Sequence, residues 1–449
     1  MFEKFPTIIS TPQRSALQMQ PDMLICQSDY PLDWYQEEFK PYAEEFLALP
    51  DRRYDTVINW MEPYIRAAQD HFGDQLLLLA HYYMGGEIVK LVEHFGGTLG
   101  DSYQLALMAV AKPEKKVIVE SAVHFMAESI SILAAPDQTV YITNPKAGCT
   151  MEMFAKDYMV EPALLDLNAR YGENNILPIC YMNTSGRIKA LVGAQGGAVN
   201  TSSNMNKIFQ WAMSKNKKIL FIPDRNMGQN AAHDLGIAPD DIAYWPAGQA
   251  AINYRLDAQD EATLKRFNRS RLILFSSLCG VHDYYRGEMV DYWKNEGFYT
   301  IAHPECRPEV IQAAHAHGST AFIMDCVLKD RAKTKHYAVA TENHMVKNLK
   351  EIGERMGITV VNISDSRIPG QPNLGCGCAT MARNDPPHLV AVLDLLRQGK
   401  SVEANRVLPG DVVNEGSGVR QRLSPEGQAW LVKNARAALE RMIEITEKH

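Results

Sequence analysis

The chain has 449 residues, of which 46% are hydrophobic, so two or three domains with packed cores are expected. Its formal net charge is −7, with 46 basic and 53 acidic residues and no long basic run. This balance argues against nucleic acid or an anionic membrane as a partner and favours a small-molecule ligand. The opening MFEKFPTIIS lacks the apolar core of a signal peptide, and no apolar stretch approaches the roughly 20 residues that span a bilayer, so we expect a cytoplasmic protein.

Three segments of the chain resemble one another. They begin LLLLAHYYMGGEIVKLVEHFGGTLGDS, ILPICYMNTSGRIKALVGAQGGAVNTSSN and YTIAHPECRPEVIQAAHAHGSTAFI. Each reads as a strand, a polar or aromatic cluster, an amphipathic helix and a Gly/Ser/Thr turn, which is typical of parallel α/β units. Ser102 follows His81 by 21 positions and Ser202 follows Tyr181 by 21, whereas the third copy is shorter.

Each copy continues with a second strand, a polar loop and a methionine, and then reaches a cysteine. The methionines are Met126, Met227 and Met345, and the cysteines Cys149, Cys279 and Cys378 lie 23, 52 and 33 residues beyond them. The long middle interval contains a charged helical segment, so residues of about 246–272 are interpreted as an insertion. A repeat of this period predicts one folding unit per copy.

The repeat predicts an α/β fold of three units. Its expected parts are an N-terminal extension at 1–60, α/β units at 61–150, 151–300 and 301–384, and a C-terminal helical segment at 385–449 that completes the fold.

In parallel α/β units, ligands gather at the carboxyl ends of the strands, so three such units could share one cavity. The three cysteines follow those ends, and the eight cysteines of the chain are not expected to form disulfides in a reducing compartment. Three thiolates could hold three irons of a 4Fe-4S cluster and leave the fourth iron open as a Lewis acid. Zinc competes, but the paired C-x-x-C spacing of zinc sites is missing.

Polar residues at the strand ends are candidates for substrate contacts. The turns GDS, TSSN and GST either cap the following helices or form a cage for carboxylate and phosphate oxygens. His81, His303 and Glu305 follow buried-looking strands, where a titratable group is costly unless it is paired or catalytic. Tyr83 and Tyr181 either pack or donate protons.

The chain resembles the quinolinate synthase family over about residues 61–447, apart from the insertion. The motifs that carry the resemblance are LAHYY, GDS, FMAES, AGC, YMNTS, TSSN, FIPDRNMG, CGVH, HPEC, GST, TEN and CATMARN. The resemblance implies three α/β/α domains related by pseudo-threefold symmetry, with parallel sheets around a central 4Fe-4S site. It also implies a transferase that condenses iminoaspartate with dihydroxyacetone phosphate to quinolinate in de novo NAD biosynthesis, coupled to an L-aspartate oxidase or dehydrogenase that produces the imine.

The resemblance also implies roles for individual residues. The cluster ligands would be Cys149, Cys279 and Cys378, the same three that the repeat selects. The catalytic residues would be Tyr83, His282, His303 and Glu305, with Glu305 suited to acid-base work. The substrate-binding residues would be His81, Ser102, Met126, Tyr181, Asn183, Ser202 and Thr320.

Two departures from the family pattern bear on these expectations. Many members carry C-x-x-C-x-x-C before the last motif, whereas Gly375 and Pro372 stand three and six positions before Cys378, so a local redox disulfide is not expected. Cys376 stays open as an alternative ligand. The segment VESAVH stands where a glycine-containing stretch is common. Two other functions also stay open, namely a different 4Fe-4S hydro-lyase and a metal-free protein that binds an anionic metabolite.

Overall fold

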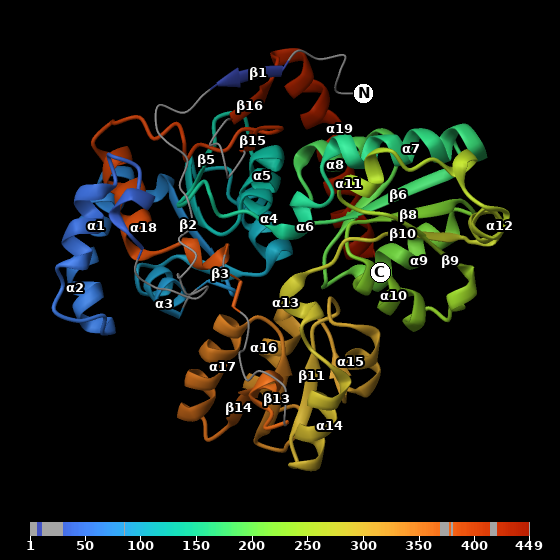
Figure 1. Ribbon diagram of the computed structural model, residues 1–449. Helices are drawn as coiled ribbons and strands as arrows, with labels where there is room; N and C mark the ends of the chain where they lie inside the picture. Colours follow the sequence, from blue (N-terminus) through green and yellow to red (C-terminus); the bar gives the residue numbers. More distant parts are fainter. Residues whose placement is uncertain are drawn as a thin grey trace. The chain divides into compact units, whose positions relative to one another are not determined.

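The computed structural model describes residues 7–10, 30–84, 86–368, 377–378, 380–413 and 420–448 (Figure 1). The chain divides into two compact units. The N-terminal unit comprises residues 2–148 and 377–428, and the central unit comprises residues 149–376 and 429–449. Among the described residues, none of the helices has both the length and the apolar character needed to cross a bilayer.

The N-terminal unit is built on a four-stranded parallel sheet of order β3-β2-β4-β5. Its strands are β2 (Leu76–His81), β3 (Thr98–Gly100), β4 (Val117–Ser121) and β5 (Thr139–Ile142), connected through α3 (Gly86–His94), α4 (Ser102–Ala111) and α5 (His124–Leu133). Every residue of β2 is buried. The apolar run LLLLAH is therefore covered on both faces, as expected for a parallel sheet.

Helices from both ends of the sequence complete this unit. In it, α18 (Pro386–Arg397) packs against α1 (Lys40–Leu47) and α2 (Tyr54–Phe72). The Tyr42 hydroxyl donates a hydrogen bond of 2.7 Å to Oδ2 of Asp394 across this contact. A small antiparallel sheet of order β1-β16-β15 joins β1 (Thr7–Ser10), β15 (Val412–Val413) and β16 (Arg420–Leu423).

The central unit contains two further parallel sheets. The first has the order β7-β6-β8-β10-β9, and the second has the order β12-β11-β13-β14. The strands of the first are β6 (Ile176–Tyr181), β7 (Ala198–Asn200), β8 (Lys218–Ile222), β9 (Ile242–Trp245) and β10 (Leu272–Phe275). Those of the second are β11 (Tyr299–Ala302), β12 (Ala316–His317), β13 (His336–Ala340) and β14 (Thr359–Asn362).

The helices of the central unit alternate with these strands. With the first sheet occur α6 (Thr150–Met153), α7 (Asp157–Tyr171), α8 (Gly186–Ala194), α9 (Met205–Ser214), α10 (Arg225–Asp234), α11 (Gln249–Ile252) and α12 (Glu261–Arg269). With the second occur α13 (Gly280–Asp283), α14 (Gly287–Asn295), α15 (Pro308–Ala313), α16 (Thr320–Leu328) and α17 (Asn343–Arg355). Short 3-10 helices lie at Leu32–Trp34, Gly73–Gln75, Pro239–Asp241, Leu256–Ala258, Ile363–Asp365 and Met381–Arg383.

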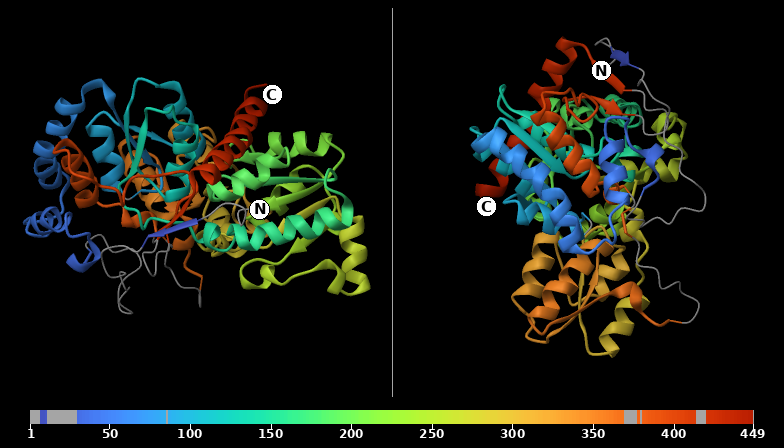
Figure 2. Two further views of the ribbon diagram at one scale, coloured as in Figure 1. Left: turned by 90° about the horizontal axis from the view of Figure 1, so that it is seen from above. Right: turned by 90° about the vertical axis from the view of Figure 1, so that its left-hand side faces the viewer.

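The C-terminal helix α19 (Pro425–Lys448) runs beside α8 in the central unit (Figures 1 and 2). A Cβ atom added at Gly193 would lie 1.9 Å from the carbonyl oxygen of Asn434, so this contact requires a glycine on α8. The Arg441 guanidinium of α19 also donates a hydrogen bond to the carbonyl of Gly197. The C-terminal helix therefore packs next to the sheet that contains β6 and β7.

The predicted α/β class with three parallel sheets is confirmed, and the three sheets share a strand order. In each, the second strand of the copy lies at one edge, followed by the first and then the third. The middle sheet differs because β10 lies between β8 and the additional edge strand β9. The predicted insertion at about 246–272 contains α11 and α12, which connect β9 to β10. The division into three domains with the boundaries given above stays a prediction.

Candidate active site

Cys279 lies where the fully buried strand β10 gives way to α13, and it is the residue that precedes that helix. The motif CGVH places His282 one helical turn later, so that its ring returns toward the cysteine. The Nδ1 atom of His282 is 3.3 Å from the sulfur of Cys279. A thiol and an imidazole from one short helix therefore face the same point.

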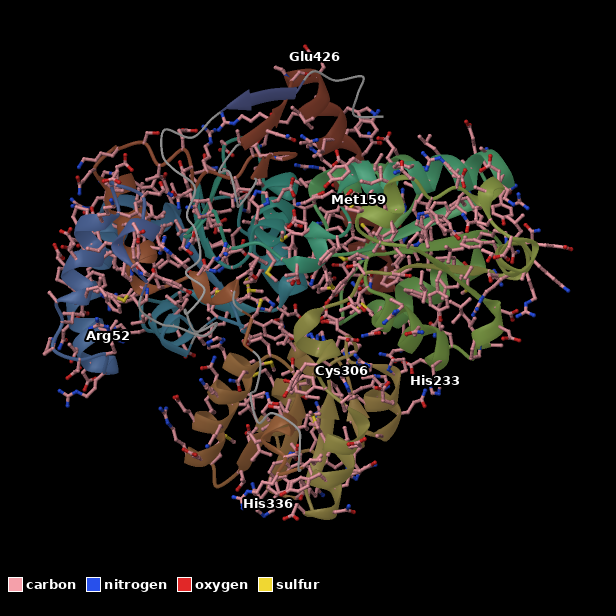
Figure 3. The ribbon with its side chains drawn as sticks, viewed as in Figure 1. Arg52, Met159, His233, Cys306, His336 and Glu426 are labelled. Carbon is pink, nitrogen blue, oxygen red and sulfur yellow. The ribbon has the colours of Figure 1, made fainter. Side chains whose placement is uncertain are left out.

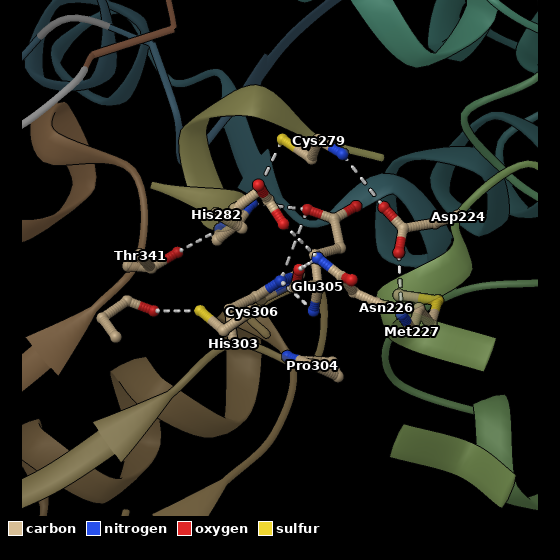
Figure 4. A network of polar contacts seen from close by, with 12 residues as sticks. Asp224, Asn226, Met227, Cys279, His282, His303, Pro304, Glu305, Cys306 and Thr341 are labelled. Atoms are coloured by element: carbon tan, nitrogen blue, oxygen red, sulfur yellow. Dashed lines mark hydrogen bonds and ion pairs between the residues drawn. The ribbon is translucent and has the colours of Figure 1, made fainter. Parts of the chain in front are cut away.

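Glu305 comes from the loop after β11 and joins this pair (Figure 4). Its Oε2 atom is 2.6 Å from Nδ1 of His282 and 3.5 Å from Nδ1 of His303. The two imidazole rings stack with centroids 4.6 Å apart and planes at 26°. All three residues are at most 2% exposed, so their electrostatic interactions act in a region that largely excludes water.

Burial and the two histidines act in opposite directions on the Glu305 carboxyl. Burial raises its pKa, but the charge and hydrogen bond of His282 and the charge of His303 outweigh burial and lower the pKa to about 2. The side chain of Tyr181, at the end of β6, adds a further hydrogen bond that lowers it. Glu305 is therefore ionised at neutral pH.

The other ring nitrogen of His282 has its own partner. Nε2 lies 3.1 Å from the hydroxyl oxygen of Thr341, which is fully buried after β13. Because an ionised carboxylate can only accept, Nδ1 carries a proton that points to Glu305. The Thr341 hydroxyl group can accept from Nε2 when the ring is charged and donate to it when the ring is neutral, so this contact fixes the orientation of the imidazole.

Asp224, which precedes α10, and Asn226, in the first turn of α10, approach the same cluster (Figure 4). One oxygen of Asp224 accepts a hydrogen bond of 3.1 Å from the Cys279 N–H. Burial and then the charge of Glu305 raise the pKa of Asp224 well above its ordinary value. The Asn226 amide donates to the backbone carbonyl of Glu305 at 3.4 Å and to Oδ1 of Asp283 at 3.0 Å.

Neither these two residues nor Thr341 was singled out from the sequence. The only signal available was that the three stand inside the motifs FIPDRNMG and TEN.

The cluster offers a set of metal ligands. One donor atom each from Cys279, His282 and Glu305 lies within 4.8 Å of the others. A thiolate suits iron-sulfur clusters and zinc, and imidazole and carboxylate suit several divalent metals. The described residues therefore fit a metal at this point of the central unit.

The burial of the cysteines separates two groups. Cys149, Cys279 and Cys378 are half-buried, whereas Cys180, Cys306 and Cys326 are buried. Burial raises the pKa of Cys180 to about 11 and also raises the pKa of the other two buried thiols, so their thiolate forms are disfavoured. Cys306, labelled in Figure 3, belongs to an apolar core cluster. The three predicted ligands are thus the more accessible thiols of the six, while Cys26 and Cys376 lie outside the described residues.

The remaining predicted residues of the central unit occupy strand ends and helix starts. Cys149 precedes α6, and Tyr181 ends β6 and is buried. Asn183 and Ser202 are half-buried in the loops after β6 and β7. Thr320 is the first residue of α16 and is buried. Of these, the structure places Tyr181 in contact with Glu305.

The N-terminal unit holds the other predicted residues. His81 ends β2, and its Nδ1 accepts a hydrogen bond of 3.1 Å from the Tyr83 N–H, with the two rings 4.8 Å apart. Ser102 begins α4, and Met126 is buried in α5. The Cys378 sulfur is 3.2 Å from the hydroxyl oxygen of Thr380. That residues from both units share one cavity, and that three cysteines share one cluster, stay predictions.

The helix caps show which residues of the Ser/Thr turns cap the following helices. Asp101 caps α4, with its side chain accepting from two backbone N–H groups, and Ser319 caps α16 by accepting from the Phe322 N–H at 3.2 Å. The capping residues therefore directly precede Ser102 and Thr320. At α9 the preceding Asn204 makes no side-chain cap and instead accepts from the Thr201 N–H at 2.7 Å. Capping does not account for the hydroxyl groups of Ser102, Ser202 or Thr320.

Comparisons with known proteins identify the family of the chain. The family model described as "NadA: Quinolinate synthetase A protein" matches residues 64–412. The chain is 35% identical over 376 residues to the quinolinate synthase of Geobacillus kaustophilus (strain HTA426), which covers 83% of this chain and 95% of that protein. For the quinolinate synthase of Acidobacterium capsulatum the identity is 34% over 408 residues, covering 90% and 95%. For that of Staphylococcus carnosus (strain TM300) it is 30% over 412 residues, covering 91% and 100%. The chain therefore belongs to the quinolinate synthetase A (NadA) family.

Proposed function

We propose that this protein is a quinolinate synthase, which condenses iminoaspartate with dihydroxyacetone phosphate to quinolinate and releases phosphate and two waters. Family membership over most of the chain supports the reaction. The observation that carries the proposal is the buried contact of His282 with Glu305 beside the thiol of Cys279. It combines a proton acceptor, its imidazole partner and a metal ligand at one point.

The cofactor that we propose is a 4Fe-4S cluster held by Cys149, Cys279 and Cys378. The contrast between these half-buried thiols and the buried Cys180 and Cys306 supports this ligand set. When bound, such a cluster with one open iron supplies Lewis acid chemistry. Because such thiols need a reducing environment, we also propose that the enzyme works in the cytoplasm. Its imine substrate would come from an L-aspartate oxidase or dehydrogenase.

We assign proton transfer to the central-unit residues. Oε1 of Glu305 is buried and has no hydrogen-bond partner among the described residues, so it is available to take a proton from the substrate. His282 holds the other oxygen at 2.6 Å and stabilises the carboxylate. We also assign substrate binding to Tyr181, and the hydrogen bond of its side chain to the same carboxylate supports a position beside the reacting groups. Exclusion of water strengthens each of these interactions.

We assign substrate binding to the strand-end residues of both units. His81, Ser102, Met126, Asn183, Ser202, His303 and Thr320 would contact the carboxylate and phosphate groups, and Tyr83 would transfer a proton. The positions of Ser102 and Thr320, each directly after a capping residue at the start of a helix, support this assignment, because their own hydroxyl groups are not used as caps.

The test is quinolinate formation by protein purified without oxygen. The protein is mixed with dihydroxyacetone phosphate and freshly generated iminoaspartate, and quinolinate and phosphate are measured by chromatography. The proposal predicts one phosphate released per quinolinate formed. A protein that carries iron and sulfide but only eliminates water from hydroxy acids would contradict it.

A further inference from the structure

Asp224 connects two segments that lie far apart in the sequence. It follows β8, precedes α10 and is fully buried. Its Oδ1 accepts a hydrogen bond of 2.7 Å from the Met227 N–H, and its Oδ2 accepts one of 3.1 Å from the Cys279 N–H (Figure 4). The backbone strengthens the same connection, because the Arg225 N–H donates to the Ser277 carbonyl at 2.8 Å. The loops after β8 and β10 are therefore fastened to each other.

The third copy of the repeat provides an internal comparison. Glu342 stands three residues before Met345, as Asp224 stands three before Met227, and it accepts a hydrogen bond of 3.0 Å from the Met345 N–H. The other Glu342 oxygen lies 2.8 Å from Nδ1 of His344 in the first turn of its own helix. Both acids thus cap a helix. The bond from the Cys279 N–H is the contact through which Asp224 reaches the candidate active site.

Capping alone does not require an acid at this position. Ser, Asn and Asp all cap helices well, since one side-chain oxygen is sufficient. A carboxyl group differs in presenting an acceptor on both sides, here toward Met227 and toward Cys279. An asparagine would turn its NH₂ toward one of these two buried N–H groups, which would then lack an acceptor.

The orientation of the Cys279 main chain determines where its sulfur lies in the site. The sulfur of this residue lies 3.3 Å from Nδ1 of His282, and that nitrogen lies 2.6 Å from Oε2 of Glu305. A rotation of the Cys279 backbone would therefore move its sulfur relative to both groups. Asn226, in the first turn of α10, also holds the Glu305 main chain through its side-chain amide.

We propose that Asp224 is a positioning residue that fixes the main chain of Cys279, and with it the direction of the thiolate, against the His282–Glu305 pair. The inference rests on the proposed function, in which Cys279 binds the cluster. Asp224 acts through Cys279 and makes no contact with the reacting atoms.

The test compares Asp224→Ser, Asp224→Asn and Glu342→Gln with the wild type, all purified without oxygen. Asp224→Ser keeps a cap and loses the acceptor for the Cys279 N–H, whereas Glu342→Gln changes the equivalent cap and leaves Cys279 untouched. The measurements are thermal unfolding, iron content, the electron paramagnetic resonance spectrum of the reduced cluster, and kcat and KM for quinolinate formation. Thermal unfolding identifies any variant that is simply misfolded.

We expect both Asp224 variants to have an altered resonance spectrum and a kcat lowered about tenfold or more, with KM nearly unchanged. We expect Glu342→Gln to keep the wild-type spectrum and kcat. A folded Asp224→Ser protein with the wild-type spectrum and kcat would overturn the inference, and so would equal changes in Glu342→Gln. A wild-type protein without cluster and activity would refute the proposed function and the inference together, so the two failures are distinguishable.

Discussion

Nδ1 of His282 and Oε2 of Glu305 are 2.6 Å apart in a site where both side chains are almost fully buried. The imidazole stabilises the ionised carboxylate, and Thr341 holds the opposite ring nitrogen. A carboxylate held in this way is a base with a defined direction and little contact with water. The predictions below depend on this pair, on the cysteines around it and on one buried acid elsewhere.

Replacing Glu305 with Gln should remove the proton acceptor while keeping the shape of the side chain. We expect the rate of quinolinate formation to fall by about 10²-fold or more, because general base catalysis contributes about 10² to 10⁴. Iron content should stay at the wild-type value, since the proposed cluster ligands are untouched. The measurement is kcat together with iron analysis. Activity that survives in the variant would show that the acid-base assignment is wrong.

Replacing Thr341 with Val should disturb His282 without changing the volume at the site much. The buried Nε2 would lose its partner, which costs about 1–3 kcal/mol of stability, and the ring, held less firmly, should lower kcat by roughly tenfold. Iron content and the overall fold should be unchanged. Thr341→Ser keeps the hydroxyl group and serves as the control, so it should retain most of the activity. Equal losses in both variants would argue against a role for the hydroxyl group.

Replacing Glu120 with Leu should stabilise the protein. Glu120 is fully buried in β4, opposite Leu79 and Ile142, and neither of its carboxyl oxygens has a hydrogen-bond partner among the described residues. Burial raises its pKa from 4.5 to about 8. The unfolded chain therefore releases this proton near pH 4.5 and the folded protein holds it to about pH 8, so stability falls as the pH rises through that window.

The stability change is measured by urea unfolding between pH 5 and pH 9. The wild type should lose on the order of 5 kcal/mol from this group across its titration, at about 1.4 kcal/mol per pKa unit. Glu120→Leu should lack that loss, while Leu at the exposed Glu114 should leave the pH dependence as it is in the wild type. Parallel pH profiles for the wild type and Glu120→Leu would contradict the prediction.

Replacing Cys378 with Ala should abolish the cluster, whereas Cys376→Ala should keep it. Cys180→Ala is the control for a buried thiol, and it should keep its iron because the Cys180 side chain is fully enclosed. The measurement is the iron content and the visible absorption of each variant after anaerobic purification. Loss of iron in Cys376→Ala with retention in Cys378→Ala would reverse the choice of ligand.

The repeated elements of the fold could be predicted from sequence because their signals are local. Apolar runs such as LLLLAH, followed by amphipathic helices, specify strand and helix within a few residues of each other. The position of β9 could not be predicted in this way. Its sequence IAYW follows α10 much as β5 follows α5, and only the pairing of β10 with both β8 and β9 shows that it is the edge strand.

The residues of the site likewise divide into those with a local signal in the sequence and those without one. His303 and Glu305 can be predicted because they follow a strand, and His282 can be predicted through its motif. The bond from Cys279 to Asp224 spans 55 positions and joins a side chain to a backbone group, so it leaves no pattern in the sequence. The contact of His282 with Thr341 spans 59 positions and also leaves no pattern in the sequence. The burial of Glu120 also required the folded chain, although VESAVH stood out as a departure from the family pattern.

The central claim is that three cysteines far apart in the sequence hold one iron-sulfur cluster beside His282 and Glu305. Iron and acid-labile sulfide, measured per chain in protein purified without oxygen, test it most directly. The account predicts a brown protein with about four irons and four sulfides per chain. A colourless protein with neither element, in which Cys149, Cys279 and Cys378 all react with a thiol reagent, would contradict it.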